Sequence, residues 1–476
     1  MTIHWLDYAI IILYFFVVVY IGYWAMKKVT NFDDYAVAGR GLPMSIFFAA
    51  IAATLCGGGA TIGRVSFMHT TGIVVFAGLI GVVINQIFSG LYIAGRVHNI
   101  KNVYSVGDLF GLYYGRAGRL VSSIVCFFFC LGLYGVQILA MGAILQTAVG
   151  IDLIPAALIS SVITLAYTWS GGILAVTLTD AVQYVIIVIG VTLCAYLAID
   201  HLGGFDAMMS ILYSNPRFET NMKPLANWSL VQFLGLFFSF LLGEFCAPYY
   251  IQRYASTKSA KDSKNGLLIF GVHWIFFMAT TAAIGLASMA IQPDVKPDLA
   301  FTNLIRDILP PGITGLVFGA LLAAVMSTGA AMINTSAVIY TRDIYNKFIN
   351  TAATQAQLLR QSRLSTLVVG GISIGVAIIF QDVFGLMIYM FKLWPSAILP
   401  PLMCGLLWGK ISPYAGAPAV IAGGLSFFLW SDKVLGEPFG IPANFIGIGM
   451  NCLVLFFVHQ KMKGHKPEGP FLPDLN

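Results

Sequence analysis

Hydrophobic positions form long, nearly unbroken runs along the whole chain, and polar residues collect in the short segments between them. Each run holds about 18 or more residues, enough for an α-helix to cross a hydrocarbon core of roughly 30 Å. The longer loops, around 96–119, 200–228 and 341–363, are expected to hold short amphipathic helices. The pattern predicts an all-α integral membrane protein with about thirteen transmembrane helices, near residues 5–26, 43–68, 72–95, 120–149, 152–169, 174–199, 229–250, 266–291, 312–340, 364–381, 384–408, 412–430 and 440–460.

Two of these runs are interrupted by residues that disfavour a helix. The second contains Cys56-Gly57-Gly58-Gly59, and the seventh contains Gly243-Glu244-Phe245-Cys246-Ala247-Pro248. Glycine is a poor helix former and proline lacks a backbone donor. Irregular backbone is tolerated at membrane depth where it lines a cavity enclosed by protein.

The interruptions fall in the first span of two successive five-span blocks, 43–199 and 229–408. Broken helices at matching positions of two halves point to the central site of an inverted-repeat transporter. We therefore expect one polytopic domain, 1–476, in which the two repeats follow an N-terminal helix at 5–26. Two C-terminal helices within 412–460 and a cytoplasmic tail at 461–476 complete the expected organisation.

Composition and charge support a membrane location. Charged residues make up 10% of the 476 positions, against roughly 25% in soluble domains. The loops divide into two alternating sets. One set has only five basic residues; the other holds the remaining loop Lys and Arg, Arg253 included, and is expected to be cytoplasmic. This predicts a cell-membrane protein, plasma or inner membrane, with its N-terminus outside. The net charge of +6 follows membrane topology and indicates no nucleic-acid partner.

Candidate chemistry begins with Ala324-Val325-Met326-Ser327-Thr328, inside the run 312–340. Two adjacent hydroxyls among small residues either bond to carbonyls of their own helix or supply oxygen ligands to a small cation. The unwound carbonyls of the glycine interruption could complete a neutral oxygen cage for Na⁺. The sequence shows no nucleophile arrangement, phosphate loop or metal-hydrolase spacing, so no enzymatic activity is predicted.

Ionisable groups within spans are costly and mark functional sites by default. Arg64, Glu244 and Lys392 either contact a solute or form ion pairs. Asp180 either takes part in ion coupling or caps a helix together with Thr177 or Thr179. The polar residues of the third and fourth spans either line the cavity or make ordinary interhelical bonds, and these are Gln86, Tyr134 and Gln137.

Four motifs resemble the sodium:solute symporter family, in its order and at its spacing. They are 53–59, 167–183 with Thr179-Asp180-Ala181-Val182-Gln183, 252–264 and 323–345 with Asp343-Ile344-Tyr345. The resemblance covers nearly the whole chain and implies a LeuT-type inverted-repeat fold. It also implies sodium-driven symport by alternating access. The sodium ligands it implies are the carbonyls of Ala53, Cys56 and Ala324 and the hydroxyls of Ser327 and Thr328. A solute would lie beside them, near Thr54, Leu55, Gly57 and Gly58.

The chain departs from the family pattern in two respects. Gly329-Ala330-Ala331 stand where many relatives carry an acidic residue and a serine, so one Na⁺ per cycle is expected. Leu55 stands where the choline branch has an aromatic residue, which disfavours a quaternary ammonium solute.

Arg64 and Lys392 favour a small anionic solute such as a carboxylate. A proton-coupled or uncoupled transporter of the same fold, and less so a ligand-sensing membrane protein, are the alternatives. The sequence predicts no oligomeric state.

Overall fold

The computed structural model describes residues 3–223, 225, 228–380 and 382–463, so most of the predicted tail at 461–476 lies outside the described residues. Nearly all of the described chain is helical. Its only pairing of extended backbone is an isolated bridge between Leu42 and Thr257.

Most of the described helices are joined by short segments. In chain order they are α1 (Trp5–Met26), α2 (Phe32–Val37), η1 (Ala38–Arg40), α3 (Met44–Leu55), η2 (Gly59–Gly63), α4 (Arg64–Thr71), α5 (Val74–Tyr92), α6 (Ala94–Asn99), α7 (Val106–Val149), α8 (Leu153–His201), α9 (Phe205–Ser214), α10 (Leu230–Leu242), α11 (Pro248–Ser256), α12 (Ala260–Ile291), η3 (Pro297–Leu299), α13 (Ala300–Ile308), α14 (Ile313–Ile339), η4 (Tyr340–Ile349), α15 (Gln355–Phe380), α16 (Val383–Ala397), α17 (Leu399–Met403), η5 (Cys404–Trp408), α18 (Gly416–Trp430), η6 (Pro438–Gly440) and α19 (Ala443–Lys461).

Eight of the described helices are long and apolar enough to cross a membrane, or ten if each of two bent pairs counts as one span. The bent pairs are α3 with η2–α4, at 58°, and α16 with α17–η5, at 53°. Three further apolar helices are shorter, at Leu153–Trp169, Leu230–Leu242 and Gly416–Trp430. The integral membrane class is confirmed, whereas the count of thirteen spans and the division into two repeats stay predictions.

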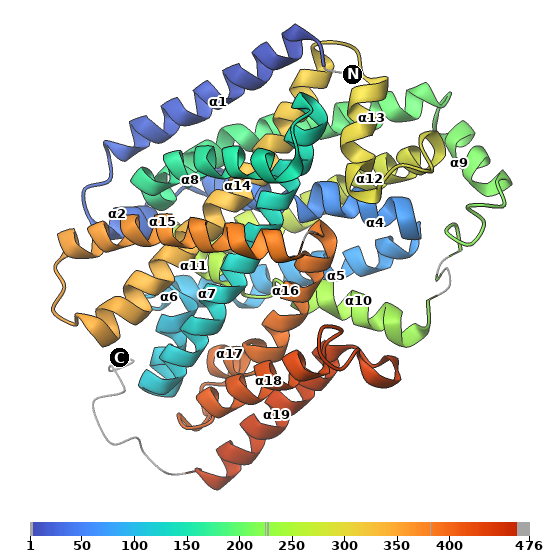
Figure 1. The fold of residues 1–476 in the computed structure, drawn as a ribbon. Helices are drawn as coiled ribbons and strands as arrows, with labels where there is room; N and C mark the ends of the chain where they lie inside the picture. The colour runs from blue at the N-terminus through green and yellow to red at the C-terminus, as the bar shows by residue number, and fades with distance from the viewer. Residues whose placement is uncertain (1–2, 224, 226–227, 381, 464–476) are drawn as a thin grey trace.

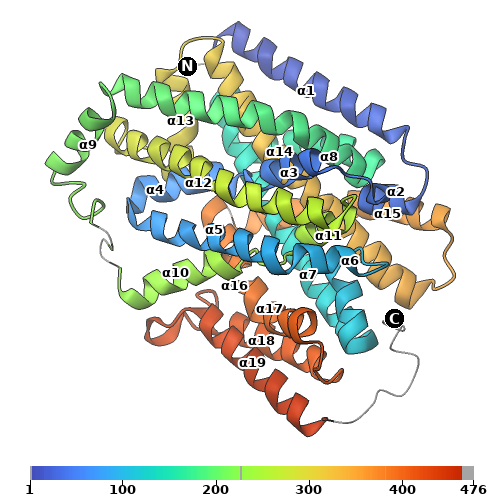
Figure 2. The ribbon, with the colours of Figure 1, turned by 180° about the vertical axis from the view of Figure 1, so that it is seen from behind.

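Helix α14 forms the centre of the bundle. It packs against α8, α7, α3 and α1, and 94% of the apolar window in its span is buried. Only 28% of the corresponding window of α1 is buried. This helix lies along one edge of the molecule, opposite α18 and α19 (Figures 1 and 2). A helix as enclosed as α14 can present hydroxyls only to other helices, so the chemistry of α14 is directed into the protein.

Both predicted interruptions are present. The first lies between the end of α3 at Leu55 and the start of η2 at Gly59, where the chain bends. A Cβ at Gly57 would meet the side chains of Thr328 and Gln137, and one at Gly59 would meet Met387. Gly57 and Gly59 therefore have no room for a larger side chain in this arrangement.

The second interruption lies between Leu242 and Pro248. Cys246 has a φ of +55°, a conformation that L-residues rarely adopt. Pro248 then begins α11, where its missing N–H leaves no helical hydrogen bond unmade. The two broken helices bring non-helical backbone to the interior of the bundle.

Candidate functional site

The two hydroxyls of α14 face the broken end of α3. Ser327 Oγ lies 3.0 Å from the carbonyl oxygen of Ala53 and 2.8 Å from that of Ala324. Thr328 Oγ1 lies 2.6 Å from the carbonyl oxygen of Thr54 and 3.0 Å from that of Ala324. Each hydroxyl therefore bonds to a carbonyl of its own helix and also reaches across to a carbonyl of α3.

These five oxygen atoms form a compact, neutral cluster that we call the sodium cage: the carbonyls of Ala53, Thr54 and Ala324 and the hydroxyls of Ser327 and Thr328. Hard oxygen donors of this kind suit an alkali cation. In the described part of the chain, no group of three or more His, Cys, Asp or Glu side chains could hold a metal ion. The donor set fits Na⁺. Thr54 supplies a carbonyl that the sequence did not assign, and no hydrogen bond places the carbonyl of Cys56 in the cluster.

A small cavity lies directly beside the cage, between the two helix interruptions. We call it the central cavity; its volume is about 40 Å³. Ligand sites usually measure roughly 300–1,000 Å³, so the cavity is contracted here and must widen to admit a solute. It is lined by Thr54, Leu55, Gly57, Gly59, Ala60, Arg64, Val82, Leu133, Val136, Gln137, Phe240, Glu244, Tyr249, Trp274, Thr328, Met332, Met387 and Phe391.

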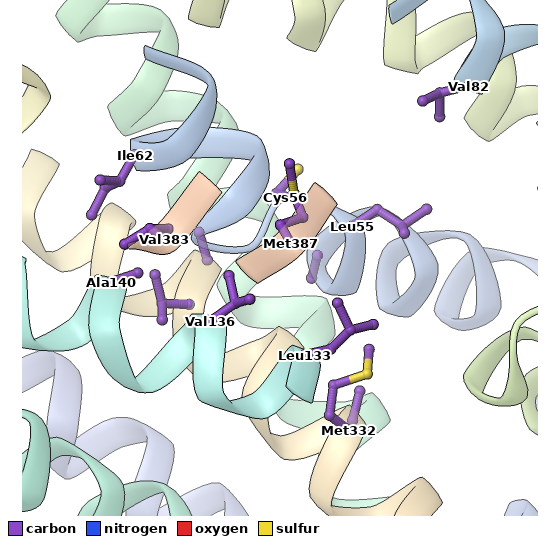
Figure 3. Close-up of a cluster of buried hydrophobic side chains, with 14 of the residues drawn as sticks. Leu55, Cys56, Ile62, Val82, Leu133, Val136, Ala140, Met332, Val383 and Met387 are labelled. Carbon is purple, nitrogen blue, oxygen red and sulfur yellow. The ribbon is translucent and has the colours of Figure 1, made fainter. Parts of the chain in front are cut away.

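Apolar side chains make up most of the cavity wall. Figure 3 shows Leu133 and Val136 of α7 and Met387 of α16 around the interruption that contains Cys56, and Met332 of α14 beside Leu133. A site enclosed in this way excludes water, which strengthens electrostatic contacts with the few polar groups present.

Two charged side chains face the central cavity without contacting each other. Arg64 donates to Thr281 Oγ1 at 3.2 Å and lies 5.1 Å from the ring centroid of Trp274. Glu244 accepts a hydrogen bond of 2.8 Å from the hydroxyl of Tyr249. Among the described residues Arg64 and Glu244 form no ion pair with each other, so both side chains remain available to contact a bound solute.

The predicted polar residues of the third and fourth spans have different positions. Gln137 accepts a hydrogen bond of 2.7 Å from the N–H of Gly58 and thereby holds the interruption of α3 against α7. Gln86 donates to the hydroxyl of Tyr250 at 2.5 Å, and Tyr134 is buried close to Gly329. Gln137 lines the central cavity, whereas Gln86 and Tyr134 do not.

Lys392 also lies away from the central cavity. Its Nζ is 2.6 Å from Glu437 Oε1, in the connection between α18 and α19. Both residues line a separate cavity of about 570 Å³. Of the two alternatives for Lys392, a solute contact or an ion pair, the structure shows the ion pair.

Asp180 is fully buried in the middle of α8, and Thr177 and Thr179 bond to carbonyls of that helix. This excludes the helix-cap alternative. Its Oδ2 atom lies 3.1 Å from Arg253 Nη2 and 3.4 Å from Thr54 Oγ1. Arg253 is 1% exposed, so its assignment to a cytoplasmic loop was wrong. Arg253 belongs to helix α11, which starts directly after the second interruption.

A model of the sodium:solute symporter family matches residues 35–423, which is most of the chain. The chain belongs to the sodium:solute symporter family. It is therefore a multi-pass membrane transporter that uses Na⁺, and not an enzyme.

Curated relatives of this symporter match over nearly its whole length. The osmoregulated proline transporter OpuE of Bacillus subtilis is 25% identical and covers 90% of this chain and 89% of its own. The sodium/proline symporter of Escherichia coli is 26% identical over 88% of this chain and 86% of its own.

Solved structures show the same fold. A Na⁺-coupled sialic acid symporter in a substrate-bound outward-open state has a TM-score of 0.82, at 20% identity, over 96% of this symporter and 98% of that chain. Mhp1, a nucleobase-cation-symport-1 family transporter, has a TM-score of 0.61 at 13% identity, over 92% of this symporter and 96% of that chain.

Sequence reasoning about this symporter missed several residues that complete the site. Tyr249 and Trp274, which contact Glu244 and Arg64, were not predicted, and neither was any role for Arg253. Trp274 lies in an unbroken apolar run, where nothing distinguishes it from a packing residue. Arg253 had a detectable signal, because it follows a helix interruption by about two turns, as Arg64 does.

Proposed function

We propose that this symporter couples the entry of one Na⁺ to the uptake of a small carboxylate-bearing solute, with an amino acid of the size of proline as the first candidate. The geometry of the cage carries the proposal. Hydroxyls of α14 and carbonyls of α3 meet at one point, and that point adjoins the central cavity. The names of the curated relatives support proline as the solute to test first.

The charges of the central cavity refine the solute expected from the sequence. Arg64 offers a guanidinium to a carboxylate, as the sequence suggested. Glu244 faces the same cavity, and a solute with only negative charge would be repelled by it. A zwitterion satisfies both groups, since its carboxylate can meet Arg64 while its amino group meets Glu244. The sequence-based preference for a purely anionic solute is therefore replaced by a zwitterion.

The cage also explains how ion and solute binding would be coupled. The Na⁺, when bound, supplies a positive charge that draws the five cage oxygens together. Thr54 and Thr328 belong to the cage and also line the central cavity. Ordering the cage therefore orders one wall of the solute site. Residues on two helices, α3 and α14, would then move as one unit. In the proposed orientation the N-terminus is outside the cell and the C-terminus is cytoplasmic.

Thermal unfolding of the purified symporter in detergent tests the proposal. A ligand that binds only the folded state raises the Tm. We expect L-proline to raise it in NaCl and much less in KCl. Neutral sugars and simple monocarboxylates serve as comparison solutes. A Na⁺-dependent rise with monocarboxylates but not with amino acids would contradict the zwitterion assignment.

Two matched variants separate a zwitterion from an anion. Arg64→Gln and Glu244→Gln should each weaken proline binding by about tenfold or more, because each leaves a solute charge unpaired. The concentration of Na⁺ that gives half the effect should stay within about twofold. If Glu244→Gln instead strengthens solute binding, the solute carries no positive charge at that carboxylate.

A further inference from the structure

A second polar pocket lies apart from the central cavity, where four helices begin or end. Helix α3 begins at Met44, α6 ends at Asn99, α11 ends at Ser256 and α12 begins at Ala260. We call it the basic pocket; its volume is about 380 Å³. All of its lining side chains are polar, and no Asp or Glu is among the described residues that line it. The lining residues are Arg40, His98, Lys101, Asn102, Thr257 and Lys258.

Hydrogen bonds hold together the three connectors that carry these residues. The N–H of Leu42 donates to the carbonyl oxygen of Ser256 at 3.0 Å, and the N–H of Lys258 donates to that of Leu42 at 2.9 Å. Arg40 Nη2 donates to the carbonyl oxygen of Val103 at 2.9 Å. The connectors before α3, after α6 and after α11 therefore meet at the basic pocket, and each brings a positively charged side chain to it.

The positive charges of the basic pocket have no carboxylate partner. Lys101 and Lys258 are exposed and, like Arg40, form no ion pair in the part of the chain that the structure describes. Asp262, the acidic residue nearest to Lys258 along the chain, accepts a hydrogen bond from Ser259 at the start of α12. Three like charges around one pocket repel one another, and a bound anion would remove that repulsion.

The basic pocket lies where spans leave the membrane, because four helices begin or end there. Helices α5, α6 and α12 pack against one another, and Figure 2 shows them on one side of the molecule. Apolar side chains are exposed on these helices, among them Leu91 and Tyr92 at the end of α5 and Ile269 and Val272 of α12. Such side chains suit the acyl chains of a lipid leaflet, and the basic pocket then lies at the level of its headgroups. The bias of basic residues predicts that this is the negatively charged cytoplasmic leaflet.

We propose that the basic pocket binds a phosphate group with a net negative charge. Basic pockets between transmembrane helices on the cytoplasmic side suit the headgroups of anionic lipids. Arg40, Lys101 and Lys258 supply the charge, and the amide of Asn102 supplies further N–H donors. An anionic phospholipid of the adjoining leaflet is the expected source of the phosphate group, and inorganic phosphate in solution is the other. A phosphatidylcholine headgroup fits less well, because no carboxylate of the described residues lines the pocket to meet its ammonium group.

A phosphate group in the basic pocket would link the two interrupted helices. Arg40 lies in the connector that leads to α3, and Lys258 lies in the connector that follows α11. Helix α3 carries Ala53 and Thr54 of the sodium cage at its other end. An anion bound between Arg40 and Lys258 fixes the beginning of α3 against the end of α11. Binding therefore stabilises the folded symporter, and it does so without Na⁺ or solute.

The experiment is thermal unfolding of the purified symporter in a neutral detergent and KCl, without Na⁺ or solute. One arm adds phosphatidylglycerol or, for comparison, phosphatidylcholine in mixed micelles. The other arm exchanges KCl for potassium phosphate at equal ionic strength. A ligand that binds the folded state raises the Tm, and we expect phosphatidylglycerol to raise it more than phosphatidylcholine does.

Two matched double variants locate the effect. Lys101→Gln/Lys258→Gln removes two charges from the basic pocket, and both side chains are exposed, so the variant should fold. Arg360→Gln/Lys461→Gln removes two exposed charges from the same predicted side of the membrane, outside the pocket. A basic side chain close to anionic headgroups contributes about fivefold to affinity. The phosphatidylglycerol concentration that gives half the effect should therefore rise by about 25-fold in the first variant and by less than about threefold in the second.

The two sources of phosphate give different results. If potassium phosphate raises the Tm with the same dependence on the variants, and phosphatidylglycerol acts no more strongly than phosphatidylcholine, the basic pocket binds soluble phosphate. Equal weakening in the two double variants would overturn the inference, because the attraction would then belong to the whole basic face. Absence of any rise in Tm with phosphatidylglycerol and with potassium phosphate would overturn it as well. Neither result bears on sodium coupling, because Na⁺ and solute are absent.

Discussion

Thr328→Val removes one hydroxyl from the sodium cage and retains the branched shape of the side chain. Thr328 is buried, and its Oγ1 atom lies 2.6 Å from the carbonyl oxygen of Thr54 and 3.0 Å from that of Ala324. Without an ion, the change costs one buried hydrogen bond, about 0.5–1.5 kcal/mol of the free energy of unfolding. The protein should therefore fold and insert normally.

The cost to ion binding is larger, because the lost oxygen would contact a charge. A hydrogen bond to a charged group contributes about 1.5–3 kcal/mol, and we take that range for a lost ion ligand. Since 1.4 kcal/mol corresponds to a factor of ten, Na⁺ affinity should fall by roughly 10- to 150-fold. The matched control is Thr328→Ser, which keeps the hydroxyl and should stay within about threefold of the wild type.

The assay is the NaCl concentration that gives half-maximal thermal stabilisation, followed by the same titration of solute uptake in proteoliposomes. Both should shift by the same factor in Thr328→Val. Uptake at saturating Na⁺ should recover most of the wild-type rate. A half-maximal concentration within twofold of the wild type would show that Thr328 does not bind the ion, and the cage would have to be assigned to other atoms.

Three further changes test other parts of the structure. Gly57→Ala should reduce Na⁺-driven uptake more than tenfold, because its Cβ would overlap a cage hydroxyl, whereas Gly319→Ala has open space and should change it less than twofold. Lys392→Gln should leave solute and Na⁺ affinity within twofold in binding titrations, because Lys392 and its partner Glu437 lie outside the central cavity. A larger loss of affinity would show that Lys392 takes part in solute or ion binding. Burial, and then the charge of Asp382, raise the pKa of Asp298 in η3, so the ionised carboxylate disfavours folding increasingly as pH rises above about 4. Asp298→Asn should therefore raise the Tm at pH 7.5 and lose that advantage near pH 4; a lower Tm at pH 7.5 would contradict this sign.

The sequence predicted the two helix interruptions and singled out the hydroxyls of α14 because these signals are local. Three consecutive glycines and a proline interrupt a helix whatever the tertiary packing around them. Both predicted interruptions are present, at 56–58 and 243–247. The hydroxyls of Ser327 and Thr328 stand out for a similar reason, since polar atoms are rare in a buried apolar helix. Four of the five predicted cage residues lie together, and only the position along the bend, Thr54 in place of Cys56, differs.

Pairing between distant segments could not be predicted in the same way. The sequence left open whether Lys392 contacts a solute or forms an ion pair, because its partner Glu437 lies 45 residues away in a connection that looks like an ordinary polar loop. Arg253 was counted with the basic residues of a loop, because charge bias along a sequence does not distinguish a loop from the short helix α11. In both cases the missing information was which carboxylate lies opposite, and that depends on tertiary packing.

The most direct test of the whole account is uptake of radiolabelled L-proline into proteoliposomes that contain the purified symporter. We predict accumulation above the external concentration when NaCl is outside and KCl inside, and loss of that accumulation when NaCl is equal on both sides. Accumulation should fall to the background of empty liposomes when KCl replaces NaCl outside. Uptake that proceeds equally well in KCl, or that follows an imposed proton gradient and ignores Na⁺, would contradict sodium coupling through the cage.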